Sequence, residues 1–416
     1  LDEDGTYASA ATLDLSVNGV APTVIVDPLT GLGSRSDKAT IGDSISISGS
    51  VSTPGAHSVV VDWGEINDSA SNADDERSVL NIAAGAPRSF VADHQYSTGG
   101  IFTVTVTLVD DSTTASVAST EVWVSGTRVD PNTNELQIIG TSGKDIVSAR
   151  LIGGGSDNAH VKVIERLDVG GGKKSGAELL YFDPDDIETV RIVLCAGNDH
   201  ATLGGTDGGS HTWYVSSILE GDAGNDHLTG GSGPNVLMGG DGNDILKGGT
   251  ESDILIGGSG KDDLKGGKGD DLLFGGWTLY DDSAESLALI MHEWNSGRDY
   301  DTRVANLWNG SGTVLNETGI SLKVSGASQS VFNIDNEKDK LKGDDDRDWF
   351  FAELGKDQII GKKEFEELNQ PASQRNDIHL VDILGTGDNT LMTDASSIAD
   401  RFADGEIVVV SDSGYQ

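Results

Sequence analysis

The sequence is poor in cysteine, in positive charge and in long hydrophobic runs. Cys195 is the only cysteine among 416 residues, so no intrachain disulfide can form. No stretch reaches the roughly 18 apolar residues that a membrane-spanning helix needs, and no signal peptide opens the chain. We therefore expect no membrane insertion. Because the chain begins at Leu1 and not at methionine, we expect it to be an internal or processed piece of a larger protein.

Negative charge, by contrast, is abundant. The chain has 68 acidic and 28 basic residues, which gives a formal net charge of −40. Nucleic acids and anionic membrane surfaces would be repelled by this charge, so neither is expected as a partner. The excess of acidic residues is instead explained by binding of divalent cations or by a surface that its charge keeps soluble. Disorder is the alternative for so acidic a chain, but a regular apolar periodicity argues against it.

Glycine and aspartate recur in a nine-residue repeat over residues 221–274. The six units are GDAGNDHLT, GGSGPNVLM, GGDGNDILK, GGTESDILI, GGSGKDDLK and GGKGDDLLF. Position eight is leucine in every unit, and position six carries Asp226, Asn235, Asp244, Asp253, Asp262 and Asp271. A fixed period with one constant apolar position predicts a solenoid, in which each unit buries its leucine only against its neighbours. A flexible linker would not keep leucine in phase.

The repeat resembles the calcium-binding nonapeptide of the RTX (hemolysin-type) family, G-G-x-G-x-D-x-U-x, in which U is apolar. The resemblance implies a parallel β-roll in which two nonads form one coil, with six residues of each turning and three forming a strand. Carboxylate oxygens suit Ca²⁺. Stacked coils lie about 4.8 Å apart, where two carboxylates repel by roughly 3.5 kcal/mol at an effective dielectric of 20. We therefore expect Ca²⁺ to be part of the fold.

Stacking of alternate nonads predicts two edges with unequal calcium affinity. The edges carry these residues: Asp226, Asp244 and Asp262 on one, and Asn235, Asp253 and Asp271 on the other. On the second edge a neutral amide replaces one carboxylate, and Glu251 takes a glycine position. The first edge should therefore hold calcium more tightly.

Five further aspartates occupy position six of isolated or degenerate nonads and are predicted as additional ligands: Asp145, Asp199, Asp339, Asp348 and Asp357. The first two lie in an irregular β-rich lead-in, residues 127–220. Their distances from the regular repeats are multiples of nine, but the residues between them break the repeat, so the spacing carries little weight. The other three lie in residues 334–365, which lose most glycines and gain aromatic residues, as expected of a cap that closes the solenoid.

Short alternating strands in residues 21–126 predict an immunoglobulin-like sandwich. One strand should bury Val59, Val61 and Trp63, and another should bury the apolar face of IFTVTVTLVD. VDWGE followed by HQYSTGGIFTVTVTLVDD resembles the PKD domain, whose hallmark is a W-D-F-G-D-G-like stretch followed by H-x-Y. The order around Trp63 is altered and the second glycine is missing. The resemblance implies a rigid spacer or adhesion module.

The remaining segments are less regular. Residues 1–20 hold one alternating strand, which is either the end of a truncated preceding domain or a strand donated to a neighbouring subunit of a fibre. Residues 277–333 contain one amphipathic helix, with Asp282 as its N-cap and Gly297 as its stop. The segment 366–416 is polar and unassigned.

A catalytic site is the competing interpretation, because RTX repeats often follow a protease or lipase domain. His292-Glu293 begins like H-E-x-x-H, but Ser296 stands where the second histidine belongs. GGGKKS at 170–175 resembles part of a phosphate loop but lacks its upstream glycine. The serine-hydrolase motif G-x-S-x-G is absent from the sequence. Asp183-Pro184 resembles the self-cleavage bond of some RTX relatives, although such pairs also occur by chance.

The sequence therefore predicts an all-β chain, an immunoglobulin-like (PKD) sandwich followed by a parallel β-helix or β-roll solenoid with one inserted α-helix. It predicts a regular roll over residues 221–276. We expect a calcium-binding, non-catalytic structural or adhesive module of a large secreted or cell-surface bacterial protein. Its expected partners are calcium ions, other copies in a fibre, or cell-surface components. The alternative is the secretion and folding region of an exported hydrolase or toxin whose catalytic domain lies outside these residues.

Overall fold

The chain divides into two compact units, Leu1–Tyr96 with Phe102–Val122 and Ser97–Ile101 with Trp123–Gln416. The computed structural model describes residues 23–52, 57–65, 77–83, 88–110, 113–153, 159–168, 177–204, 212–312, 314–316, 318–332, 337–353, 355–361, 367–368, 380–382 and 408–409. The predicted strand in residues 1–20, the GGGKKS segment and most of residues 366–416 lie outside this part of the chain.

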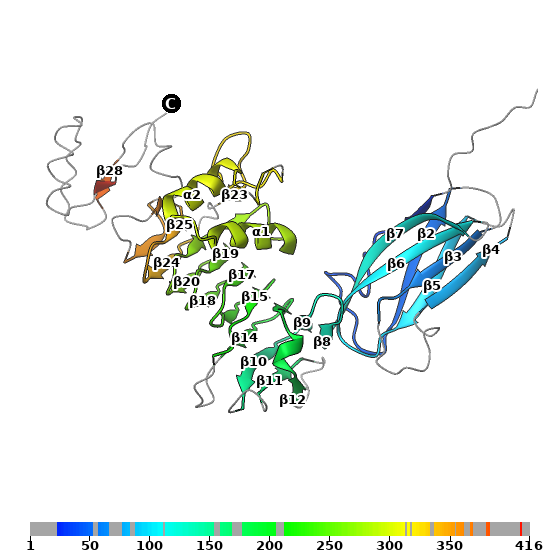
Figure 1. The fold of residues 1–416 in the computed structure, drawn as a ribbon. Helices are drawn as coiled ribbons and strands as arrows, with labels where there is room; N and C mark the ends of the chain where they lie inside the picture. Colours follow the sequence, from blue (N-terminus) through cyan, green and yellow to red (C-terminus); the bar gives the residue numbers. More distant parts are fainter. Residues whose placement is uncertain are drawn as a thin grey trace, which may run out of the picture. The chain divides into compact units, whose positions relative to one another are not determined.

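The first unit holds two sheets (Figure 1, blue to cyan). One has the order β1-β2-β5, and its strands are Val24–Val26, Ser44–Val51 and Ser89–Gln95. The other has the order β4-β3-β6-β7, with strands Arg77–Ile82, His57–Asp62, Gly100–Asp110 and Thr113–Val124. The predicted inward faces are confirmed, since these side chains are buried: Val59, Val61, Trp63, Phe102, Val104, Val106 and Leu108.

A buried aromatic cluster joins these strands at Trp63. Its ring stacks on His94 at a centroid distance of 4.9 Å, and the Tyr96 hydroxyl donates to its carbonyl oxygen at 3.0 Å. Nε2 of His94 lies 3.0 Å from a carboxylate oxygen of Glu65, which is itself buried. Gly64, which follows Trp63 in the sequence, has φ +71°, and a Cβ there would lie 2.7 Å from the Thr103 carbonyl oxygen. These residues therefore serve packing and turn geometry.

The second unit is built on two nine-stranded sheets, here called the β18 sheet and the β17 sheet. The β18 sheet has the order β12-β11-β10-β14-β16-β18-β20-β24-β26, with strands Glu178–Phe182, His160–Arg166, Ile146–Ile152, His200–Leu203, His227–Thr229, Ile245–Gly249, Asp263–Gly267, Lys340–Asp344 and Gln358–Ile360. The β17 sheet has the order β27-β25-β21-β19-β17-β15-β13-β9-β8, with strands Glu367–Leu368, Trp349–Phe351, Leu272–Phe274, Ile254–Ser259, Asn235–Asp241, Ser216–Glu220, Thr189–Val193, Glu135–Ile139 and Gly126–Asp130.

Parallel pairing within both sheets follows an 18-residue step. Leu228 pairs with Leu246, and Leu237 pairs with Leu255, so the partners differ by 246 − 228 = 18 and 255 − 237 = 18. Successive nonads therefore alternate between the sheets, and two nonads form one coil, as the family resemblance implies. All six position-eight leucines are fully buried in one core: Leu228, Leu237, Leu246, Leu255, Leu264 and Leu273.

The core continues beyond the regular repeats in both directions. Across residues 277–333 the pairing resumes without a gap, because Leu264 pairs with Leu341 and Leu273 with Phe350. On the other side Ala201 pairs with Leu228, so the irregular lead-in belongs to the same roll. It ends in antiparallel pairs, β10–β11–β12 and β8–β9.

The inserted segment contains two helices, where the sequence predicted one. Helix α1, Ala284–Trp294, is capped by the Ser283 hydroxyl and not by Asp282, since Ser283 accepts from the Ser286 amide at 3.1 Å. Helix α2, Tyr300–Asn309, follows after a short turn and ends at Gly310 in the left-handed conformation. Its sequence YDTRVANLWN is short and largely polar, so its apolar stripe gives a weak periodic signal. Within the described residues, no helix has the length and apolar character to cross a membrane.

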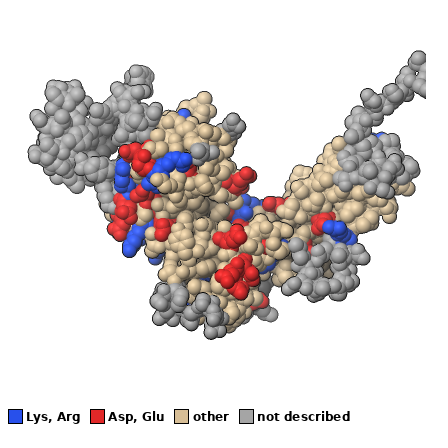
Figure 2. Space-filling view, in the orientation of Figure 1, with Lys and Arg blue, Asp and Glu red and all other residues tan. Residues whose placement is uncertain are grey.

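The helices cover the outer face of the β17 sheet, and a short ladder of β22, Trp277–Thr278, with β23, Val331–Phe332, joins the insert. Their cluster includes Val236, Ile254, Ile256, Leu272, Phe274, Leu287, Ile290, Trp294, Val304, Leu307 and Trp349. The outer face of the β18 sheet is polar instead, with ion pairs Lys340–Asp263 at 2.9 Å and Lys265–Asp344 at 3.4 Å. Figure 2 shows acidic and basic side chains interspersed on the visible surface of this unit.

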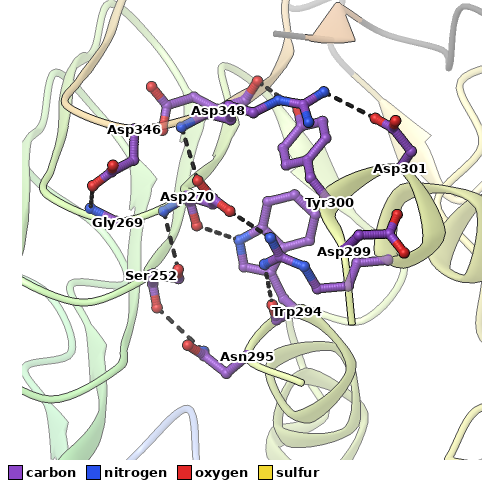
Figure 3. Close-up of polar contacts among 12 residues, drawn as sticks. Ser252, Gly269, Asp270, Trp294, Asn295, Asp299, Tyr300, Asp301, Asp346 and Asp348 are labelled. Atoms are coloured by element: carbon purple, nitrogen blue, oxygen red, sulfur yellow. Dashed lines mark hydrogen bonds and ion pairs between the residues drawn. The ribbon is translucent and has the colours of Figure 1, made fainter. Parts of the chain in front are cut away.

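Polar contacts fix the helix pair to the turns of the roll (Figure 3). The Trp294 indole N–H donates to the Asp270 carbonyl, and Arg303 pairs with the Asp270 carboxylate while lying 4.8 Å from the Trp294 ring centroid. The Tyr300 hydroxyl donates to the Asp348 carbonyl at 2.8 Å. The insert is therefore part of the roll's packing and its hydrogen bonding.

Replacing Leu246 by alanine should lower the free energy of unfolding by about 3 kcal/mol, because the cavity would lie in a fully closed core. Leu279→Ala is the matched control, since Leu279 is 63% exposed and should change stability little. Urea unfolding in saturating calcium measures both variants. Equal losses in the two variants would contradict the assignment of position eight to the core.

Candidate metal centre

The position-six side chains form two columns that run along the roll. The first column contains Asp145, Asp199, Asp226, Asp244, Asp262, Asp339 and Asp357. The second contains Asn235, Asp253, Asp271 and Asp348. In each step the backbone N–H of one member donates to Oδ1 of the next, at 2.7–3.0 Å in the first column and 2.7–2.9 Å in the second. The structure thus brings all eleven predicted residues together in two ladders.

Asp145 and Asp199, whose spacing in multiples of nine residues carried little weight in the sequence, both occupy positions in the first column. The Asp145 amide donates to Asp199 at 2.7 Å, and the Asp199 amide donates to Asp226 at 2.7 Å. The residues between them break the repeat because they include the added antiparallel strands β11 and β12, while the ladder positions keep their place.

In five inner aspartates the second carboxylate oxygen is buried and has no hydrogen-bond partner within the described part of the chain. This holds for Oδ2 of Asp199, Asp226, Asp244, Asp253 and Asp271. A buried charged oxygen without a partner costs more free energy than the ladder hydrogen bond returns. A cation at this oxygen would remove that cost.

Glycine at position one leaves room beside this oxygen. A Cβ on Gly239 would lie 2.4 Å from Oδ2 of Asp244 and 2.5 Å from the Gly257 carbonyl oxygen of the next coil. A Cβ on Gly248 would lie 2.3 Å from Oδ2 of Asp253, again with a glycine carbonyl oxygen at 2.5 Å. Carboxylate and carbonyl oxygens of successive coils therefore converge where a side chain is missing.

Glycine at position two lets successive turns approach closely. Gly240 has φ +100°, and a Cβ there would lie 1.9 Å from the Asp222 carbonyl oxygen of the preceding coil. Gly258 has φ +102° and a similar approach to Gly240. The repeat needs glycine here for both φ and space.

The oxygen-only environment fits a hard divalent cation. Ca²⁺ accepts six to eight oxygens from carboxylates, carbonyls and water. Among the described residues, no group of three His, Cys, Asp or Glu side chains is placed to hold a metal. A bound ion would therefore take backbone carbonyl oxygens in addition to one or two carboxylates.

Burial raises the pKa of these aspartates well above the usual range of an exposed carboxylate. The pKa rises to about 6 for Asp226, about 7 for Asp199 and Asp244, and about 8 for Asp253, and the pKa of Asp271 is also raised well above its ordinary value. Loss of solvation is the main cause in each case, and neighbouring carboxylates add to it. Without a cation, protons would neutralise the columns, so metal and proton compete for the same oxygens.

The two ends of the first column differ from its middle. Both oxygens of Asp145 accept backbone N–H groups, from Asp168 at 2.7 Å and from Thr141 at 2.6 Å. Asp357 likewise accepts from Asp339 at 3.0 Å and from Glu353 at 2.6 Å. Protein hydrogen bonds thus satisfy both end carboxylates.

Ser217 extends the second column by one step that the sequence analysis missed. Its hydroxyl donates to Oδ1 of Asn235 at 2.7 Å. Ser217 lies 18 residues before Asn235, and this spacing could have indicated its place in the column. The surrounding segment VSSILE, however, resembles the nonad only in Leu219.

The family model of the RTX calcium-binding nonapeptide repeat matches this chain in four copies, over residues 220–255, 247–277 and 335–363. These repeats bind Ca²⁺, so the predicted cofactor is confirmed. The third match covers the degenerate segment that resumes the ladder after the helices. No curated protein matches the chain.

Asp244→Ala should weaken calcium binding more than Asp253→Ala, by roughly tenfold, or about 1.4 kcal/mol. Asp244 lies between two carboxylates of its column, whereas Asp253 has the neutral amide of Asn235 on one side. Isothermal titration with CaCl₂ measures both affinities. The opposite order would refute the ranking of the two columns.

In calcium-free solution the roll should become less stable as the pH rises from about 5 to about 8. Folded carboxylates with a pKa of about 6 to 8 bind more protons in this range than unfolded aspartates, which titrate near 3.9. The stability is therefore present below the unfolded pKa and is lost as the pH passes the folded pKa. Urea unfolding of the metal-stripped chain at several pH values measures this trend, and saturating calcium should abolish it. A metal-free roll that gains stability over this range would contradict the expectation.

Proposed function

We propose that the chain is a non-catalytic structural module of a secreted or cell-surface bacterial protein, and that its second unit becomes rigid when calcium fills the two aspartate columns. The observation that carries this proposal is the series of buried Oδ2 atoms without a hydrogen-bond partner among the described residues. Beside a position-one glycine, Oδ2 of Asp226, Asp244 and Asp253 converges with a glycine carbonyl oxygen of the next coil. The ligands proposed are the position-six aspartates with unmet oxygens, led by Asp199, Asp226, Asp244, Asp253 and Asp271.

An extracellular location agrees with this chemistry. Calcium-binding modules outside the cell typically have dissociation constants of about 10⁻⁴ to 10⁻³ M. A roll that folds only at millimolar or near-millimolar calcium would remain unfolded where calcium is scarce and would fold where calcium is abundant. The net charge of −40 adds to this dependence, because self-repulsion opposes the compact state without cations.

The first unit is proposed to be a PKD-like spacer. The residues that carry the resemblance, Trp63, His94 and Tyr96, form its packed aromatic cluster. In the turn that follows Trp63, the Gly64 amide donates to Oδ1 of Asp62 at 3.1 Å, so this carboxylate has a structural role. A spacer in the same chain as a roll made rigid by calcium would suit an adhesive protein that contacts cell-surface components. Assembly into fibres would rest on residues 1–20, outside the described part of the chain.

A calcium titration of the whole chain tests the proposal. Calcium should increase the β signal in circular dichroism and should slow hydrogen exchange in residues 212–274, where the ladder amides donate to Oδ1 atoms of the next coil.

 

The first unit should be unaffected, because its core contains none of the column residues. Magnesium is the matched control ion, since its smaller shell demands stricter geometry. A β signal that stays the same in excess chelator would sink the proposal.

A further inference from the structure

Asn235 is the only amide in the two columns, and its side chain is fully hydrogen-bonded within the protein. Oδ1 accepts from the Gly231 amide at 3.0 Å and from the Ser217 hydroxyl at 2.7 Å. Nδ2 donates to the Gly233 carbonyl at 2.7 Å and to Oδ1 of Asp253 at 2.8 Å. The orientation of the amide is fixed, because a backbone N–H can only donate and a backbone carbonyl can only accept.

Nδ2 of Asn235 lies where the aspartate coils place their unmet oxygen. A Cβ on Gly230 would lie 2.8 Å from this nitrogen and 2.6 Å from the Gly248 carbonyl oxygen. In the next coil a Cβ on Gly248 would lie 2.3 Å from Oδ2 of Asp253 and 2.5 Å from the Gly266 carbonyl oxygen. The same cradle therefore holds an N–H donor in one coil and an acceptor without a partner in the other.

We propose that the side-chain amide of Asn235 replaces a calcium ion at the first coil of the second column. Its N–H groups join a carbonyl oxygen and the carboxylate of the next coil, the kind of oxygens that a cation would join. This inference rests on the proposed calcium role of the columns. The coil is closed by hydrogen bonds, with Ser217 ending the column, and takes no ion between Asn235 and Asp253.

Aspartate at this position would reverse the arrangement. Its Oδ2 would face the Gly233 carbonyl and Oδ1 of Asp253, so that only acceptors would meet there. Asn235→Asp should therefore create a calcium site and make this coil depend on metal.

Native mass spectrometry and calorimetry on the full chain test this gain of a site. Asn235→Asp should bind one more calcium ion than the wild type, and its metal-free form should melt at a lower temperature, with recovery in calcium. Asn243→Asp is the control, because it adds the same charge at an exposed position of a neighbouring turn. An unchanged number of ions in Asn235→Asp would overturn the proposal, as would an equal gain in both variants.

Hydrogen exchange of the wild type tests the proposal without any substitution. On removal of calcium, the turn at residues 231–235 should lose less protection than the turn at residues 249–253, because only the first is closed by an amide. Equal loss in both turns would overturn the inference. A wild type that binds no calcium would instead show that the proposed function itself is wrong.

Discussion

The stacking of buried carboxylates along the roll is the constraint on which the rest of the second unit depends. Each position-six backbone N–H donates to Oδ1 of the next coil, which fixes the 18-residue step and holds the turns in register. The same bond leaves Oδ2 buried beside a glycine carbonyl oxygen. In the inner aspartates such as Asp226, Asp244 and Asp253, one carboxylate oxygen thus organises the backbone, and the other is the oxygen that we propose a cation binds. Leucine at position eight packs the interior, but it cannot meet the electrostatic need of the turns.

The two sheets have different outer faces, and this difference explains the insert. The β17 sheet is apolar on both sides, since Val236, Ile254 and Leu272 face away from the leucine core. It therefore needs a third layer, and α1 and α2 provide it from a segment placed between two consecutive coils. The outer face of the β18 sheet carries Lys247 and Lys265, which tolerate solvent. Arg303 pairs with Asp270 and Tyr300 donates to the Asp348 carbonyl, and both contacts attach the helices to the turns. The helical layer therefore also stabilises the end of the second column at Asp348.

Local sequence predicted the elements whose signals repeat at short range. The nonads specified the leucine core and the two columns because their period is independent of the rest of the chain. Other features depend on partners far apart in sequence: Asp262 pairs with Asp339 across the insert, and Asp145 pairs with Asp199 across four strands. Helix α2 was missed because its stripe is short and gains its burial from the sheet. The cap of α1 was misplaced by one residue, since Asp282 and Ser283 are both good capping residues and the turn geometry decides between them.

The same ladder explains how the roll can end. A column that stopped at an aspartate with an unmet oxygen would leave a buried charge at an open end. The first column avoids this, because backbone N–H groups of Thr141 and Glu353 complete the carboxylates of Asp145 and Asp357. The second column begins with neutral groups, the Ser217 hydroxyl and the Asn235 amide, which bring their own donors. At these three column ends, departures from the consensus nonad therefore lie where the need for a cation ends, and their chemistry follows from the carboxylates that they face.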